Sequence, residues 1–313
     1  MITLPVNKFL GTITNLIAYE QVADSLQAGD VGRFVDAFQD VNVDNGDGKV
    51  VRYTDIYDVE DLSATSTLLK SNPPKAGEQY IPVTQFKDIP LTINQYLLRG
   101  AFVQEDQLAY FIAHLMAVME TTKTVFMAKQ LIAQIEAYTP TNEEQTVEVD
   151  LLTPAAEASA QEIDAIDRLN AKRIYKAVIN KTDDVAWDNT KYNDTGFTEI
   201  INKQEMNLVI KTNENTDMVV DALATLLNSS RITDEEKWGK TLKVPSNKFS
   251  ETSKKVIGWL LHRRKVQFGF YYQVAVSFFD ASTLNQNNWL HFAYYLDTLK
   301  PLPMFKIVNK NAQ

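Results

Sequence analysis

At 313 residues, the chain can form one large domain or two to three smaller ones, and a composition that is 45% hydrophobic and 23% charged supports a sizeable core. Its 31 basic and 40 acidic residues give a formal net charge of −9, which argues against a dedicated nucleic-acid binder, because phosphate contacts require clustered Lys and Arg. The absence of cysteine excludes disulfides, thiolate metal sites and a cysteine nucleophile.

The N-terminal residues lack the basic head, long apolar stretch and small-residue site of a cleavable signal. No apolar run reaches the roughly 20 residues that a membrane-spanning helix needs. We therefore expect no membrane partner and assembly in a reducing cytoplasm, which the lack of cysteine also fits.

The first hundred residues lack regular helical spacing. Residues 1–40 are expected to be irregular or weakly helical, with short amphipathic turns. The Asn-Gly-Asp-Gly sequence at 45–48 predicts a tight turn, and residues 49–53 read as a strand that leaves it. Further on, Pro73, Pro74 and Gly77 indicate a loop tip.

Residues 81–93 alternate apolar and polar positions, as a strand does, but Pro82 and Pro90 interrupt them. Proline cannot donate a ladder hydrogen bond, so such strands belong at sheet edges or in two-stranded ribbons. An isolated ribbon is marginal in water. We therefore expect another subunit to cover it.

An unbroken helical pattern follows. Residues 103–137 contain no Pro or Gly, and large apolar side chains recur at steps of three and four until Pro140 ends the run. A continuous helix of this length would measure roughly 50 Å, well beyond the average globular helix. The β-branched Thr121, Thr122 and Thr124 are its weakest point.

The middle of the chain mixes helical and strand patterns. Residues 146–151 indicate a short strand, and a second helix is expected from 159 or 161 to 180, followed by a polar loop to 197. The apolar run 206–211 is typical of a buried strand, and caps at 215–217 predict a helix that ends near Leu227.

The C-terminal part predicts one more helix and two strands. Residues 254–262 are interpreted as a short helix. Residues 265–279 then alternate apolar and polar positions without a break, which is the clearest strand pattern in the chain. A turn predicted at 285–288 leads into a second strand, 289–299, which Pro301 ends.

No common catalytic or nucleotide-binding motif is present, and neither paired cysteines nor histidines stand at metal-ligand spacing. His114, His262 and His291 each lack a second ligand nearby in the sequence. We expect no catalytic residue, no cofactor and no metal. A Ser-His-Asp relay stays possible, because its members need not be neighbours in sequence.

The dense basic cluster His262-Arg263-Arg264-Lys265 has two interpretations. It can face packaged nucleic acid or an acidic neighbour. It can also close a helix C-terminus, where cations complement the helix dipole. The second interpretation is favoured because the chain as a whole is acidic.

The order of these elements resembles the tailed-phage major capsid proteins of the Hong Kong 97 fold. Three stretches carry the resemblance: VVRYTDIYDVEDLS, KDIPLTINQYLLRGAFVQEDQLA and FTEIINKQEMNLVIKTNENTDMVVDALATLLN. The first two are similar to the entry to and exit from that family's extended loop, and the third to its axial-domain strand and helix. No long charged N-terminal segment is present, so a scaffold would be a separate protein. No cross-linking Lys/Asn/Glu set is matched.

The resemblance implies an α+β capsid subunit with five parts. They are an N-terminal arm (1–40), an extended loop (41–100), a peripheral domain with its spine helix (101–158), an axial domain (159–264) and a return to the peripheral domain (265–313).

The function that this resemblance implies is self-assembly into the hexamers and pentamers of an icosahedral phage head around double-stranded DNA. The expected partners are further copies of the chain, scaffolding and portal proteins, and DNA bound without sequence specificity. The expected location is the virion, after assembly in the host cytoplasm. The expected subunit-contact residues are Leu62, Leu68, Leu69, Tyr80 and Phe86. Alternatives are an encapsulin-like shell around protein cargo, a tail-tube subunit, or an enzyme of unknown class.

Overall fold

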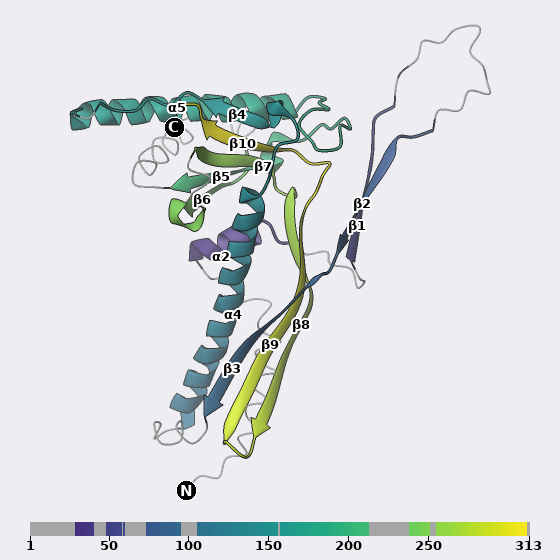
Figure 1. Ribbon diagram of the computed structural model, residues 1–313, viewed down its shortest axis with the longest axis vertical. Coiled ribbons are helices and arrows are strands. Elements are labelled where there is room, and N and C mark those ends of the chain that lie inside the picture. The colour runs from purple at the N-terminus through teal and green to yellow at the C-terminus, as the bar shows by residue number, and fades with distance from the viewer. Residues whose placement is uncertain are drawn as a thin grey trace. The chain divides into compact units, whose positions relative to one another are not determined.

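The computed structural model in Figure 1 describes residues 29–40, 48–57, 59, 73–94, 105–155, 157–212, 238–250 and 255–311. The chain forms two compact units. The first comprises Met1–Lys49, Ile81–Leu131 and Gln267–Asp297, and the second comprises Val50–Tyr80, Ile132–Val266 and Thr298–Gln313. None of the described helices is long and apolar enough to cross a membrane.

The first unit contains a three-stranded sheet in the order β3-β9-β8. Its strands are β3 (Gln85–Asn94), β9 (Asn285–Thr298) and β8 (Val266–Asp280). β3 runs antiparallel to β9 and places Pro90 opposite Trp289. The proline-containing strand therefore lies at a sheet edge, as its sequence predicts.

The long helix predicted over 103–137 is confirmed as α4, Glu105–Glu136. Met119 of α4 joins a small apolar cluster with Leu290 of β9. Two turns further along, the Phe126 ring stands edge-on to Phe292 and Tyr294, with centroids 6.1 and 6.0 Å away. Lys123 Nζ donates to Gln273 Oε1 of β8 at 3.1 Å. A stripe at helical spacing thus packs on one face of the sheet.

A short helix, α2 (Gly29–Asp36), precedes this sheet in the chain. Phe34, Val35 and Phe38 are buried. Immediately after the helix, Gln39 forms an isolated parallel bridge with Phe268 at the start of β8.

The second unit contains a five-stranded sheet in the order β4-β10-β7-β5-β6. Its strands are β4 (Thr146–Val149), β10 (Met304–Asn309), β7 (Val256–His262), β5 (Met206–Thr212) and β6 (Thr241–Pro245). Single 3-10 turns lie at Glu143–Gln145, Lys203–Glu205 and Ser246–Lys248. The strands predicted within 146–151 and 206–211 are confirmed.

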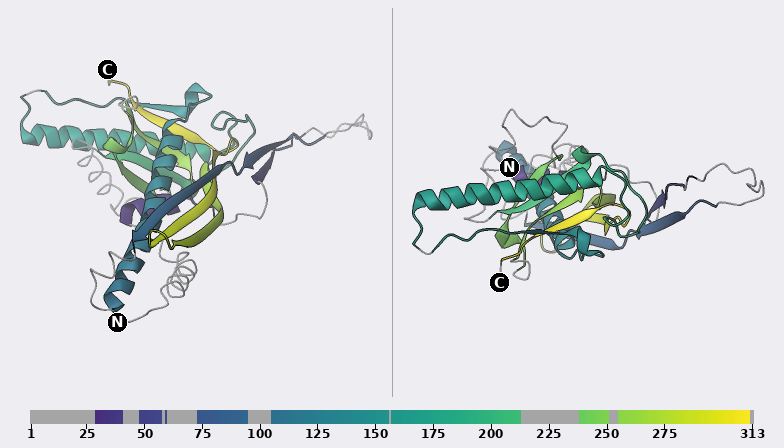
Figure 2. Two further views of the ribbon diagram at one scale, coloured as in Figure 1. Left: turned by 60° about the horizontal axis from the view of Figure 1, so that its bottom comes forward. Right: turned by 90° about the horizontal axis from the view of Figure 1, so that it is seen from above.

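Helix α5, Ala160–Val185, covers one face of this sheet (Figure 2). Ser159 begins it with a capping box, accepting from the Glu162 backbone N–H while the Glu162 side chain reaches back. Its apolar side chains pack in one core with β5, β7 and β10, represented by Ile174, Leu208, Leu260 and Phe305. The helix continues five residues beyond the predicted end at 180, and Thr182 and Val185 there are buried.

Two predictions in the C-terminal part are wrong. Residues 254–262 were expected to be helical, but Val256–His262 is β7, paired with β10 on one side and β5 on the other. A continuous apolar run fits a strand buried on both faces as well as a helix, so its neighbours decide. Gly258 lies so close to the Val209 carbonyl oxygen that a Cβ would clash there.

The turn predicted at 285–288 lies earlier, between Asp280 and Asn285. The Asp280 carboxylate accepts hydrogen bonds from the Ser282 N–H and the Ser282 and Thr283 hydroxyls. An Asp side chain that bonds residues two and three positions on favours a turn there. β9 consequently begins at Asn285.

A separate two-stranded ribbon pairs β1 (Gly48–Thr54) with β2 (Ala76–Pro82), as Figure 1 shows. β1 confirms the strand predicted over 49–53. Gly77, predicted at a loop tip, instead lies in β2 against the Tyr53 ring, where a Cβ would clash. The helix predicted after 215 lies outside the described residues.

Candidate functional site

The ribbon is held at its base by the loop that follows α5. Asp55 Oδ1 accepts a hydrogen bond from the Thr198 N–H at 2.9 Å. The Tyr53 and Phe197 rings pack edge-on with centroids 5.3 Å apart. The pKa of Asp55 is lowered, chiefly by the Thr198 N–H. These contacts attach β1 to the second unit.

A glutamine attaches β2 to the same unit. Gln79, which is buried, donates from Nε2 to the Thr298 carbonyl at 3.0 Å and accepts the Lys300 N–H on Oε1 at 2.9 Å. Its side-chain amide therefore bonds to the backbone of 298–300 as a neighbouring strand would. Both strands of the ribbon are thus held by contacts with the rest of the second unit.

The ribbon and its continuation expose apolar side chains. Val59 is 100% exposed, Tyr57 69% and Ile56 58%, and Tyr80 of β2 is 55% exposed. Most large apolar side chains gain by burial, so a concentration of exposed ones indicates a contact surface.

The five predicted contact residues do not lie together on one element. Tyr80 lies on the ribbon, in the second unit. Phe86 is 72% exposed on β3, in the first unit. Leu62, Leu68 and Leu69 lie outside the described residues.

The sequence also predicts that Asp58 to Lys87 projects as a loop whose apolar side chains are buried mainly by a neighbour, and this segment is too long at its C-terminal end. Ile81 is only 2% exposed, and Gln85–Lys87 pair with Phe292–Tyr294 of β9. A strand that pairs within the sheet belongs to the subunit's own fold. The part of this segment that can serve as an assembly arm therefore ends before Ile81.

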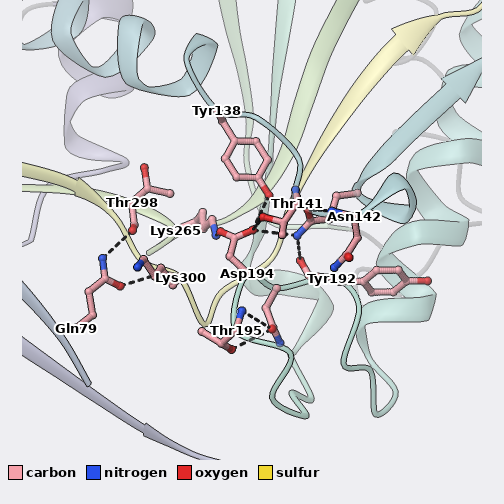
Figure 3. A network of polar contacts seen from close by, with 12 residues as sticks. Gln79, Tyr138, Thr141, Asn142, Tyr192, Asp194, Thr195, Lys265, Thr298 and Lys300 are labelled. Atoms are coloured by element: carbon pink, nitrogen blue, oxygen red, sulfur yellow. Dashed lines mark hydrogen bonds and ion pairs between the residues drawn. The ribbon is translucent and has the colours of Figure 1, made fainter. Parts of the chain in front are cut away.

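A polar network centred on Asp194 lies beside Gln79 and Lys300 (Figure 3). Lys265 Nζ, fully buried, pairs with Asp194 Oδ2 at 2.6 Å. The other oxygen, Oδ1, accepts from the Tyr138 hydroxyl at 3.2 Å, the Thr141 hydroxyl at 3.1 Å and Gln145 Nε2 at 3.1 Å. The carboxylate is therefore satisfied on both sides, as a buried ion pair requires.

The backbone of Lys300 connects this network to the ribbon. The Asp194 N–H donates to the Lys300 carbonyl at 3.0 Å, and the Lys300 N–H donates to Gln79 Oε1. Lys300 thus links the buried ion pair to β2. The ion pair and the ribbon strand β2 thus share one chain of hydrogen bonds.

The favoured interpretation of the basic cluster 262–265 is wrong, because the cluster forms the turn between β7 and β8 and closes no helix. His262 Nε2 and Arg263 both contact the Glu205 carboxylate, at 3.2 and 2.7 Å. Burial lowers the pKa of His262, and the His262 hydrogen bond lowers the pKa of Glu205. Three of the four side chains of the cluster, His262, Arg263 and Lys265, thus have carboxylate partners within the subunit.

Glu199 follows Thr198, whose N–H binds Asp55 beside the ribbon, and its carboxylate lies in an unfavourable environment. Its Oε2 is buried and accepts no hydrogen bond from the described residues. Burial raises the pKa of Glu199 to about 7, against the opposing pull of Lys265. Lys265 thus interacts electrostatically with two carboxylates, but it forms a direct ion pair only with Asp194.

The described residues hold no group of three or more acidic, His or Cys side chains that could bind a metal ion. His291 lies on β9 opposite Asp88, and His114 lies in α4. Sequence reasoning missed Asp194, Gln145 and Lys265 as a set, because they are far apart in the chain. The apolar residues that alternate after Lys265 belong to the predicted strand 265–279, but the basic residues His262 to Arg264 just before it gave no sign that the Lys265 side chain is buried.

A family comparison decides between the possible functions. The Phi29-like phage major capsid protein family matches residues 7–307. The chain belongs to this family. No curated protein sequence matches it significantly.

Solved structures agree with this fold. A chain from the capsid of Staphylococcus phage Andhra is 10% identical, with a TM-score of 0.61 and coverage of 87% of this chain and 83% of that one. A chain from a structure of the head fiber and inner core protein gp22 of native bacteriophage P68 is 11% identical, with a TM-score of 0.60 and coverage of 89% and 84%. A chain of the mature bacteriophage PhiM1 capsid is 11% identical, with a TM-score of 0.52 and coverage of 86% and 84%.

These matches confirm the predicted α+β fold of the Hong Kong 97 type and the predicted capsid-forming function. The protein is a structural component of the virion that assembles with copies of itself into a shell. The alternatives, a compartment shell for protein cargo and a tail-tube subunit, are not favoured by these relatives.

Proposed function

We propose that the subunit forms the hexamers and pentamers of an icosahedral head around double-stranded DNA, and that the tip of its ribbon lies over a neighbouring subunit. The exposed apolar side chains of the ribbon carry this proposal: Tyr57 is 69% and Val59 100% exposed on a ribbon whose base is firmly attached. A fixed base and an apolar, uncovered end are what an assembly arm requires.

Each contact between two subunits contributes a modest free energy, but a shell contains many such contacts. A large apolar side chain gains about 1.5 to 3 kcal/mol on full burial, before the cost of ordering is subtracted. A closed shell repeats each contact in every subunit, so modest pairwise contacts become decisive. The predicted residues Leu62, Leu68 and Leu69 lie between β1 and β2 in the sequence, and we propose that they add to this surface.

In the assembly that we propose, residues 159–264 gather around the capsomer centre as an axial domain. Residues 101–158 and 265–313 form the peripheral domain, stiffened by α4. The arm 1–40 and the loop 41–100 reach neighbours. Scaffolding and portal proteins are separate partners, the packaged DNA is held without sequence specificity, and assembly takes place in the host cytoplasm. The role is structural rather than catalytic, and involves no membrane.

The test replaces residues 58–72 with a short Gly/Ser turn, which leaves Gln79, Ile81 and β3 intact. We expect a subunit that melts cooperatively, as the wild type does, but that forms no closed shells by electron microscopy. Val31→Ser on α2, where Val31 is 41% exposed, serves as the control for loss of an exposed apolar side chain and should still assemble. Normal shells from the 58–72 variant would contradict the proposed role of the ribbon.

A further inference from the structure

One short segment of the second unit both attaches the ribbon and carries a buried acid. Thr198 donates its N–H to Asp55 at 2.9 Å, and the Phe197 ring packs against Tyr53. The next residue is Glu199, whose Oε2 is buried and accepts no hydrogen bond from the described residues. The attachment and the acid are adjacent in the chain, so a movement of one displaces the other.

The charges around Glu199 do not balance when its carboxylate is ionised. The cation that faces it is Lys265, which is fully buried and already forms an ion pair with Asp194 at 2.6 Å (Figure 3). The Tyr138 hydroxyl, which also binds Asp194, brings no positive charge. Two carboxylates then share one cation, and an uncompensated buried charge is costly. A protonated Glu199 leaves this site neutral.

The two strands of the ribbon are attached by different chemistry. β1 is held through Thr198 and Asp55, next to the buried acid. β2 is held through Gln79, whose neutral amide bonds to the backbone of Thr298 and Lys300. A change of charge at Glu199 therefore acts on the attachment of β1, while the attachment of β2 contains no group that titrates with it.

We propose that ionisation of Glu199 opens the attachment of β1, so that the base of the ribbon is closed while Glu199 is protonated and loosens when Glu199 is charged. An outward movement of the segment brings the carboxylate into water and separates the Thr198 N–H from Asp55. The ribbon is the proposed contact with a neighbouring copy, so this inference describes a regulation of that contact and rests on the proposed function.

The direction of the pH dependence follows from which state holds the proton more tightly. Burial raises the pKa of Glu199 to about 7, whereas in the open segment the carboxylate returns to its ordinary value of 4.5. The closed state therefore binds the proton more tightly, and opening becomes more frequent as the pH rises from about 4.5 through about 7. Asp55 stays ionised over this range, because the Thr198 N–H lowers its pKa from 3.8 and Lys75 lies 3.9 Å away.

Hydrogen exchange of the Thr198 N–H in free subunits measures the opening, because the bond to Asp55 must break before deuterium enters. We would compare the wild type, Glu199→Gln and Asp188→Asn at about pH 5.5 and about pH 8, corrected for the intrinsic exchange rate. Asp188→Asn is the matched control, since Asp188 is an exposed carboxylate next to the residue that bridges to Glu199. The Leu208 N–H in the core strand β5 reports global unfolding.

In the wild type, protection of the Thr198 N–H should fall about ten-fold between the two pH values, after discounting for partial exposure, and stay below that of Leu208. Asp188→Asn should behave in the same way, whereas Glu199→Gln should keep the higher protection at both. The same fall in Glu199→Gln would overturn the inference.

The wild type alone also decides the matter if Glu199→Gln does not fold. Wild-type protection of Thr198 that is constant between the two pH values, or equal to that of Leu208 at both, overturns the inference. Either result leaves the proposed function intact, because no shell enters the measurement. Failure of the proposed function would instead be seen as normal shells from the 58–72 variant.

Discussion

The Asp194–Lys265 pair shows what single residues contribute to this fold. The Lys265 side chain is buried against the Asp194 carboxylate, and a buried cation is stable only where a partner neutralises it. Desolvation lowers the pKa of Lys265, and Asp194 opposes that shift. Glu199, the second carboxylate, is only partly compensated by Lys265, and its Oε2 accepts no hydrogen bond from the described residues.

Glu199→Gln tests the cost of this arrangement. The pKa of Glu199 is raised from 4.5 to about 7, so the folded state holds the proton more tightly than the unfolded state. Folding stability therefore falls as the pH rises from about 4.5 to about 7 and stays lower above that window. We expect Glu199→Gln to stabilise the protein by about 1 to 2 kcal/mol at pH 8, after discounting for partial exposure, and by almost nothing at pH 4.5.

Denaturant melts of the wild type and Glu199→Gln at the two pH values measure this difference. Asp184→Asn, a partly exposed carboxylate on α5, is the control for general charge removal. A stabilisation of equal size at both pH values would contradict the assigned cause, because only the ionised carboxylate carries the cost.

At the scale of elements, α4 is the most demanding feature, since 32 residues form a single helix. The Thr122 hydroxyl donates to the Val118 carbonyl at 2.7 Å on its exposed side. Thr122→Pro should cost about 3 kcal/mol or more and prevent soluble expression or assembly, because proline removes a helical bond and clashes with the preceding turn. Thr122→Ala should fold normally, with equal helical circular dichroism.

Equal yields of Thr122→Pro and Thr122→Ala particles would contradict this expectation. Such a result would mean that the subunit tolerates a break in α4, and the stiffness that we assign to the helix would have no role in assembly.

The spacing of apolar residues was sufficient to predict α4, α5 and β8. Each of these elements buries one face, so its apolar residues recur every 3.6 residues in a helix or every 2 in a strand. It failed for β7, where apolar side chains on both faces erase the period and only pairing with β5 and β10 fixes the strand. The network around Asp194 could not be predicted at all. Its members approach through tertiary folding, and no spacing in the sequence relates Gln145, Asp194 and Lys265.

For the whole molecule, the fold class and the capsid-forming function were predicted more reliably from the sequence than any site. The family match and the capsid folds confirm both. Contacts between copies stay a prediction, because they depend on surfaces and not on the core that periodicity reveals. Of the five predicted contact residues, Tyr80 and Phe86 are exposed as a contact requires.

The central claim, that a neighbour covers the ribbon in the shell, is tested most directly by trypsin cleavage after Lys75. The Lys75 side chain is 66% exposed and immediately precedes β2. We expect cleavage after Lys75 in assembled shells to be about ten-fold slower, or more, than in free subunits, because a local segment that is covered opens less often. Equal rates of cleavage in shells and in free subunits would contradict the account.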